Sequence, residues 1–340
     1  MPFPWISFLL ALPAPAAGDP SQDLAQLSLR DLMRMRVSDV NVPGVYHVHA
    51  PGEAMIGLSL GAMRMDGLRD GTSSVDTATA LGTYPVAPLE MDMQHAMLHV
   101  MYGWSGRLTL AAMLPWSSRS MEHATGMGGM FTTRSQGVGD LRVSGLWSLL
   151  ERDERQLFAD LGVSLPTGSI DARDQTPMSG GNEVRLPYPM QLGSGTWDVL
   201  PALTWLEQRG DWNYGARAGA VLRTGRNDND YRLGDRWNAT AWASRLVGHN
   251  TSLSLRLAGS TWDDVHGADP QLMPSVSPAA DPDLQAGSRL DLHLGLNVFD
   301  FGPGDSLRAL LEVGVPVWQD LDGPQLETDL LLAFGLEWRH

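Results

Sequence analysis

The sequence predicts an all-β protein, an antiparallel transmembrane β-barrel of about twelve strands with short periplasmic turns and long extracellular loops. Two observations predict it. Apolar residues recur at every second position along most of the chain, which is the period of a strand with one apolar face. The segments with this period are joined by connections that alternate between short and long, as in outer-membrane barrels.

The N-terminus predicts export. Residues 5–12 form a short apolar run, and an Ala-x-Ala pattern follows at Ala14 and Ala16. This is typical of a signal peptide, which we expect at residues 1–17, although no basic residue precedes the apolar run. A disordered Pro/Ala leader is the alternative. Residues 18–52 are expected to form a periplasmic segment, with the barrel at 53–340.

The period changes to two near Glu53. At residues 286–298, for example, Leu290 and Leu292 alternate with Asp291 and His293. Successive side chains of a strand face opposite sides, so each segment has one apolar face and one small or polar face. Strands are expected at residues 54–66, 90–104, 107–116, 136–149, 155–165, 196–206, 211–224, 235–246, 249–262, 286–298, 304–317 and 327–338.

The connections between these segments predict the location. Short ones lie near residues 105–106, 150–154, 207–210, 247–248 and 299–303, and long ones near 67–89, 117–135, 166–195, 225–234, 263–285 and 318–326. Outer-membrane barrels have short periplasmic turns, long extracellular loops and an even strand number. A soluble β-sandwich has no reason to keep its long loops on one side. We therefore expect a Gram-negative outer-membrane protein with both termini in the periplasm.

Aromatic residues support a membrane location. Tryptophans near strand ends are expected to form interfacial girdles rather than to fill a soluble core: Trp104, Trp116, Trp147, Trp197, Trp205, Trp237, Trp262 and Trp338. The alternating residues 330–338 resemble the terminal strand that the barrel-assembly machinery recognises, although the chain ends on His340 rather than on an aromatic residue.

Charge limits the partners. The formal net charge of −15 argues against a nucleic-acid partner. The long loops are acidic, as at Asp263 and Asp264, and loop carboxylates can bind divalent cations that bridge anionic lipopolysaccharide. Solvated loops are the alternative. We expect outer-membrane lipid and lipopolysaccharide as surroundings.

Three stretches carry a family resemblance, at residues 108–171, 185–205 and 316–338. Their most specific pieces are GVGDLRVSG at residues 137–145, SLPTGS at 164–169 and the loop PVWQDLDGPQ at 316–325. From about His47 to its end, the chain resembles the outer-membrane family labelled as meta-pathway phenol-degradation proteins, often called simply transporters. The resemblance implies a barrel, a periplasmic N-terminus and a transport role for an aromatic compound. It implies no catalytic residue.

The second predicted strand carries the candidate site. Its methionines and histidines share one parity, while Leu98, Val100 and Tyr102 share the other and suit lipid better. The Met/His row should therefore line the lumen, beside methionines of the first and third strands. The predicted lumen set is Met91, Met93, His95, Met97, His99, Met101, Met63, Met65 and Met113.

Two interpretations of this row stay open. Thioether and imidazole suit Cu(I), so Met97 and His99 are hypothesised to bind a soft metal such as copper. The alternative is that methionine packs the lumen as a flexible apolar filler. No other cofactor is expected.

Charged residues also fall on the inward parity. Pairing across neighbouring strands is the expected arrangement, while unpaired charges would set the selectivity of a pore. The predicted set is Arg142, Arg217, Arg256, Asp291, His293, Arg308 and Glu312, with Asp160, Arg223 and Glu337.

The sequence thus predicts a channel for a small solute, either an aromatic compound or a soft metal ion. The alternatives are a lipid-modifying enzyme and a non-conducting structural barrel. A lipase of this kind needs a histidine and a serine on the lipid-facing wall. Because His95, His99 and His293 fall on the inward parity, we expect no enzyme.

Overall fold

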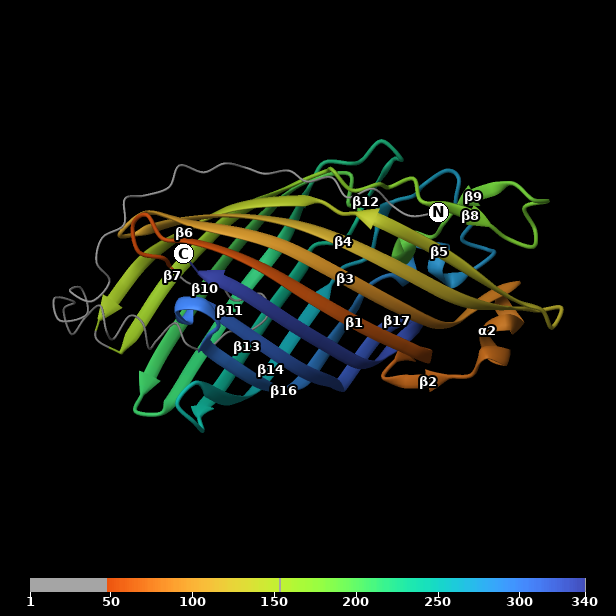
Figure 1. The fold of residues 1–340 in the computed structure, drawn as a ribbon. Coiled ribbons are helices and arrows are strands. Elements are labelled where there is room, and N and C mark those ends of the chain that lie inside the picture. Colours follow the sequence, from red (N-terminus) through yellow and green to blue (C-terminus); the bar gives the residue numbers. More distant parts are fainter. Residues whose placement is uncertain (1–47, 153, 340) are drawn as a thin grey trace, which may run out of the picture.

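The computed structural model describes residues 48–152 and 154–339. The predicted signal peptide and all but the last residues of the predicted periplasmic segment lie outside this range. The described chain forms a closed antiparallel β-barrel (Figure 1). No described helix is long and apolar enough to cross a membrane.

Eleven strand elements close the ring in the order in which they follow along the chain, and β17 completes it by pairing with β1. They are β1 (Ala54–Gly71), β3 (Val86–Ser105), β4 (Leu108–Thr125), β6 (Leu141–Arg152), β7 (Arg155–Leu165), β10 (Trp197–Arg209), β11 (Trp212–Thr224), β13 (Arg236–Leu246), β14 (Thr251–Trp262), β16 (Gly287–Phe301) and β17 (Leu307–Arg339). Two further strands, β2 (Ser73–Val75) and β5 (Met130–Val138), pair with β1 and β4 outside the ring.

β17 contributes two neighbouring strand segments to the barrel wall, each of which crosses the membrane once. Its first part pairs with β16 and its second part with β1. The Arg339 N–H donates to the Ser306 carbonyl at 3.0 Å, and a Cβ on Gly335 would lie 3.7 Å from the Leu310 Cβ, so the two parts lie side by side as a hairpin. With ten elements that cross once, the wall has twelve crossings, which confirms the predicted architecture.

The alternation of exposed apolar and buried side chains along each strand indicates which surroundings stabilise this barrel. On β3, Leu98 is 48% exposed and the next residue, His99, only 2%. The same contrast recurs around the ring, where aliphatic side chains such as Leu58, Leu255 and Val313 cover the outer face. A continuous apolar exterior on a closed sheet needs lipid around it, and a closed sheet leaves no backbone group unpaired in lipid. The protein is therefore a transmembrane barrel of the outer-membrane type.

Tryptophans border the apolar exterior. Trp116, Trp197 and Trp237 are exposed near the long loops, and Trp104 and Trp338 near the short turns, as expected for interfacial girdles. The prediction was wrong for Trp262, which belongs to the inward parity of β14. The outward positions of that strand are odd-numbered, as Leu253, Leu255 and Leu257 show, so residue 262 faces the lumen.

The long connections gather at one end of the barrel, with helix α2 (Thr77–Thr83), β2, β5, β8 (Arg173–Gln175) and β9 (Glu183–Arg185) (Figure 1). The short turns lie at the opposite end, together with Arg339 and the first described residues (Figure 1). The Gly52 N–H donates to the carbonyl of Gly103, near the β3–β4 turn, and the Gly103 N–H donates to the Glu53 carbonyl.

Two predicted long loops are wrong. Residues 318–326 lie within the strand element β17. Residues 117–135 form a long hairpin instead, because β4 continues to Thr125 and β5 returns from Met130. Beyond Trp116 the outward positions are polar, as at Ser118 and Ser120, so the apolar signal of period two disappears although the strand continues.

Candidate functional site

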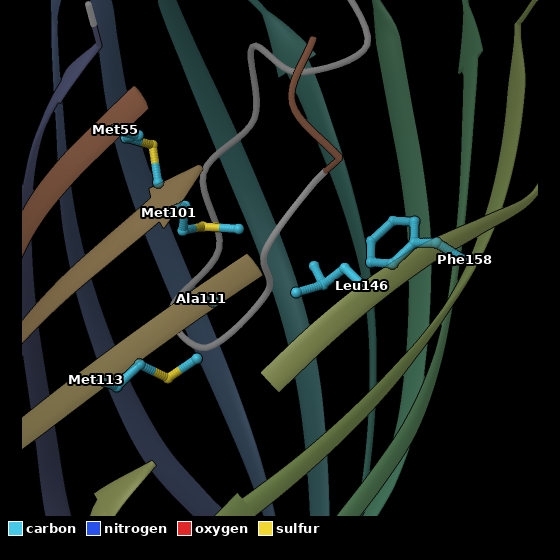
Figure 2. Close-up of a cluster of buried hydrophobic side chains, with 6 residues drawn as sticks. All are labelled: Met55, Met101, Ala111, Met113, Leu146 and Phe158. Carbon is cyan, nitrogen blue, oxygen red and sulfur yellow. The ribbon is translucent and has the colours of Figure 1, made fainter. Parts of the chain in front are cut away.

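An apolar cluster fills the lumen near the short turns. Figure 2 shows Met55, Met101, Ala111, Met113, Leu146 and Phe158 pointing into the barrel from five neighbouring strands. Val48, from the segment before β1, and Leu206 of β10 pack against it. We call this group the inner cluster. It narrows the lumen at the end where both described ends of the chain lie.

A second apolar cluster lies at the opposite end. Met91 of β3 and Met121 of β4 pack against Leu186 and Met190, which come from the long connection between β7 and β10. We call this group the outer cluster. The 3-10 helix η1 (Tyr188–Met190) carries Met190 into the mouth of the barrel.

A cation on the wall holds this connection in place. The Arg119 guanidinium of β4 donates to the Pro189 carbonyl at 2.7 Å and also to the Gln191 carbonyl. Ser135 of β5 donates to the Met190 carbonyl at 2.7 Å. These bonds use the carbonyl groups of a 3-10 turn that would otherwise be buried without partners. Side chains of the wall therefore hold this connection across the mouth of the barrel.

Three connections form a cap above the mouth. Tyr188 packs edge-on against Tyr231 with ring centroids 5.0 Å apart, and the Tyr188 hydroxyl accepts from the Asp269 N–H at 3.2 Å. Arg185 forms an ion pair with Asp269 at 3.2 Å. Burial raises the pKa of Tyr188, and in Tyr231 burial again is the main cause of a raised pKa. Both phenols stay neutral at physiological pH.

The motif residues of the family resemblance build the base of this cap. The Asp140 carboxylate accepts from the Gly168 N–H at 2.9 Å and from the Ser194 N–H at 2.7 Å. The Ser194 hydroxyl also contacts Asp198, at 3.1 Å. A side chain at Gly168 would collide with Gly193, since a Cβ on Gly168 would lie 2.7 Å from the Gly193 Cα. The first two motifs thus serve loop attachment, whereas the third, at residues 316–325, contributes residues to the lining of the lumen.

A cavity of about 380 Å³ remains in the lumen beneath the cap. One wall is made by the methionines Met63, Met65, Met91, Met93 and Met121, from β1, β3 and β4. The facing wall contains Arg223, Arg236, Arg289 and Trp262, from β11, β13, β16 and β14. These two groups of strands lie on opposite sides of the ring. We call this space the lumen cavity.

Two histidines occupy the wall between the cavity and the inner cluster. A Cβ on Gly61 would lie 2.0 Å from the His95 ring, and a Cβ on Gly57 would lie 2.1 Å from the His99 ring. Each imidazole therefore lies flat across the glycine with which its residue pairs on β1. The His99 Nε2 reaches the Glu337 carboxylate at 3.5 Å.

The structure places all nine predicted lumen residues on the inner face and separates them. Met63, Met65, Met91 and Met93 line the lumen cavity, Met101 and Met113 belong to the inner cluster with Met97 packed against it, and His95 and His99 lie between. Among residues 48–152 and 154–339, no three His, Asp or Glu side chains are placed to hold a metal ion together.

The predicted lumen charges are largely paired across strands. Arg217 contacts Asp160 at 2.9 Å and Arg256 forms two contacts with Glu312, in both cases across strands, whereas Asp291 pairs at 2.9 Å with Arg289 of its own strand, β16. His293 lies 3.4 Å from the same Glu312 carboxylate. Arg223 pairs with Asp198 and Arg308 is buried, while Arg142 faces inward beside Met113.

Sequence reasoning placed Arg223 in the lumen but missed the other three residues of the cavity's second wall, Arg236, Arg289 and Trp262. Arg236 pairs with Trp262 in the β13–β14 register, and its guanidinium lies 5.2 Å from the centre of the Trp262 ring. The alternation of inward and outward positions along each strand would have predicted that the side chains of Arg236 and Trp262 face the lumen. This alternation could not predict that they lie opposite the methionines, because that depends on the closure of the ring.

One solved structure agrees with this fold at a TM-score above 0.5. An outer membrane channel from Pseudomonas putida F1 aligns over 88% of this chain and 100% of its own, with a TM-score of 0.60 and 14% identity. The transport unit of the autotransporter AIDA-I from Escherichia coli aligns over 90% and 96%, with a TM-score of 0.48 and 11% identity. The translocator domain of NalP from Neisseria meningitidis aligns over 91% and 95%, with a TM-score of 0.46 and 11% identity.

No curated protein matches the chain in sequence. One family does: the model described as "Putative MetA-pathway of phenol degradation" matches residues 76–300, which run from the connection after β1 to the end of β16. Since this match covers more than half of the chain, the protein belongs to the family of this description, and its fold is that of an outer-membrane barrel.

Proposed function

We propose that this protein is a channel of the Gram-negative outer membrane that passes a small solute through its lumen. The lumen cavity carries the proposal, since it lies inside the barrel between the outer and the inner cluster. Its volume suits a small molecule. The family description supports an aromatic solute. The described ends of the chain lie at the short-turn end, which we assign to the periplasm.

The two clusters serve as gates in this proposal. Methionine supplies half of the inner cluster and three of the four residues of the outer cluster, and its unbranched side chain changes rotamer easily and repacks around a guest. A solute enters when the cap and Met190 yield, rests in the cavity, and leaves when the inner cluster yields. Because Met93 lines the cavity between the gates, a bulky group on this residue would obstruct the path.

The test is ion conductance in planar bilayers. The chain has no cysteine, so a single cysteine at Met93 can be labelled selectively with a bulky thiol reagent. The matched control is Gln94→Cys, because residue 94 is exposed on the opposite face of the same strand. We expect current that falls after labelling of Met93→Cys and persists after labelling of Gln94→Cys. Equal currents before and after labelling in both variants would contradict a path through the cavity.

A soft metal ion is the second candidate solute. It is favoured by one observation, the succession of His95, Met97 and His99 on the inner face of β3. Glu337 beside His99 adds a negative charge there. Stoichiometric binding of Cu(I) that disappears on substitution of Met97 and His99 would support it. Equal binding by the doubly substituted protein would refute this assignment.

A lipid-modifying role is not part of the proposal. The histidines of the described barrel strands, His95, His99, His123 and His293, all face the lumen, so none is available to a lipid substrate at the outer wall. We propose outer-membrane lipid and lipopolysaccharide as the surroundings of the barrel and the barrel-assembly machinery as its folding partner.

A further inference from the structure

The lumen cavity has two walls of different chemistry. The methionine wall offers thioether and methylene groups, with Met91 and Met121 nearly inaccessible and Met63, Met65 and Met93 partly open. Such a surface adapts to a compact apolar body and gives no hydrogen bond to a polar one. Apolar recognition is therefore the role of this side.

The facing wall carries three arginines, of which two are neutralised. Arg223 forms an ion pair with Asp198, and Arg289 pairs with Asp291 and donates to the Thr328 hydroxyl at 2.6 Å. Arg236 has no ion-pair partner among the described residues. One guanidinium in the cavity thus keeps an uncompensated positive charge.

The position of Arg236 leaves the N–H groups of its guanidinium available to a ligand. Its guanidinium lies over the Trp262 ring at 5.2 Å, and the indole N–H of Trp262 is already used by the Gln285 carbonyl at 2.7 Å. The guanidinium N–H groups lie in one plane and bind carboxylates two at a time. The cation–π contact with Trp262 holds the arginine in place, and its side-chain N–H groups have no hydrogen-bond partner among the described residues.

Other charges near the cavity do not cancel this site. Asp263 begins the connection after β14 and lines the cavity at its loop end, but it forms no ion pair with Arg236. A cationic solute would meet three guanidinium groups here, while a neutral one would leave the donors of Arg236 unused. A solute with one negative charge would satisfy them.

We propose that the lumen cavity binds small monoanions with an apolar body, such as aromatic carboxylates, with the body against the methionine wall and the anionic group on Arg236. The inference deepens the proposed channel function by naming a class of solute. It rests on that function only for the route by which the anion arrives, since binding can be measured without transport.

The test is calorimetric titration of the detergent-solubilised full barrel. The probes are benzoate, its neutral relative benzyl alcohol, the cation benzylammonium, and acetate, which has the charge without the ring. We expect benzoate to bind at least about ten-fold more tightly than the other three. Arg236→Gln should lower benzoate affinity by about ten-fold and leave benzyl alcohol unchanged, because only the anion loses a partner.

The barrel supplies a matched control for the arginine. Arg245, at the other end of β13, lies over the Trp212 ring at 5.5 Å, outside the cavity. Arg245→Gln should leave benzoate affinity unchanged. Met93→Gln should weaken benzoate and benzyl alcohol alike, since it changes the apolar wall. The difference in gel mobility between heated and unheated samples confirms that each variant is folded.

Three results would overturn the proposal: benzyl alcohol that binds as tightly as benzoate, benzoate affinity unaffected by Arg236→Gln, or no binding of benzoate. None of these results depends on whether the barrel conducts ions. If the barrel conducts ions but gives one of these three results, the proposed solute class is refuted and the channel function is not. If the barrel binds benzoate as expected but does not conduct, the channel function is refuted and the solute class is not.

Discussion

The ion pair between Arg256 and Glu312 should be one of the strongest attachments in the barrel wall. Glu312 is only 2% exposed, and both of its oxygens accept from the guanidinium, one of them at 2.9 Å. The two residues come from β14 and β17, which flank β16, so the pair spans three strands. Removal of the carboxylate charge would leave a buried cation without a partner.

Glu312→Gln should therefore lower the free energy of unfolding by about 3–5 kcal/mol. This corresponds to roughly two to four orders of magnitude in the ratio of folded to unfolded protein. The assay is a urea titration of the barrel folded in lipid vesicles, followed by tryptophan fluorescence. Glu183→Gln, an exposed position in β9, serves as the control and should change little.

A double variant separates the net value of the pair from the cost of breaking it. Arg256→Met with Glu312→Leu replaces both ions by apolar side chains of similar size and should recover most of the loss. Two outcomes would refute the reasoning: a loss below about 1 kcal/mol in Glu312→Gln, or a double variant as unstable as the single one.

Three further predictions concern the wall, the membrane and the cap. Gly57→Ala should cost about 1–3 kcal/mol, because its Cβ would lie 2.1 Å from the His99 ring, and His99→Ala in the same chain should restore stability in the urea titration. Leu98→Arg, on the lipid-facing side of β3, should cost about 2–4 kcal/mol in vesicles, and an effect near zero would contradict the assigned face. His123 lies seven residues beyond the girdle residue Trp116, in the part of β4 above the membrane, and burial lowers its pKa to about 4. Since the unfolded chain binds this proton near pH 6.5 and the folded one only near pH 4, stability should fall as the pH drops through this window, and His123→Phe should flatten the decline in titrations at pH 7, 5.5 and 4.5.

The strands were predictable because each carries its own signal. Leu290 and Leu292 alternate with Asp291 and His293 whatever the neighbouring strand is, so the sequence predicts twelve crossings and the inward parity of the Met/His row. The prediction that Trp262 belongs to the interfacial girdle failed because it used only the distance of this residue from the strand end. Its place near a strand end says nothing of the face it occupies, and the parity of β14 turns it inward.

The cavity was not predictable, because it depends on contacts between distant segments. Arg236 faces the methionines only because β13 and β3 lie on opposite sides of a closed ring. Met190 belongs to a connection that reads as a solvated loop, yet Arg119 and Ser135 hold it in the mouth of the barrel. Such side chain to backbone contacts leave no periodic trace in the sequence.

The central claim is that a small solute passes through the lumen cavity. Its most direct test is uptake of radiolabelled benzenesulfonate, a permanently charged ion that does not cross a bilayer unaided, into vesicles containing the purified barrel. We expect uptake that is abolished when the cysteine of Met93→Cys carries a bulky thiol reagent and is unaffected when that of Gln94→Cys does. Vesicles with the unlabelled barrel that take up no more than protein-free vesicles would contradict the claim, as would uptake that both labelled variants retain.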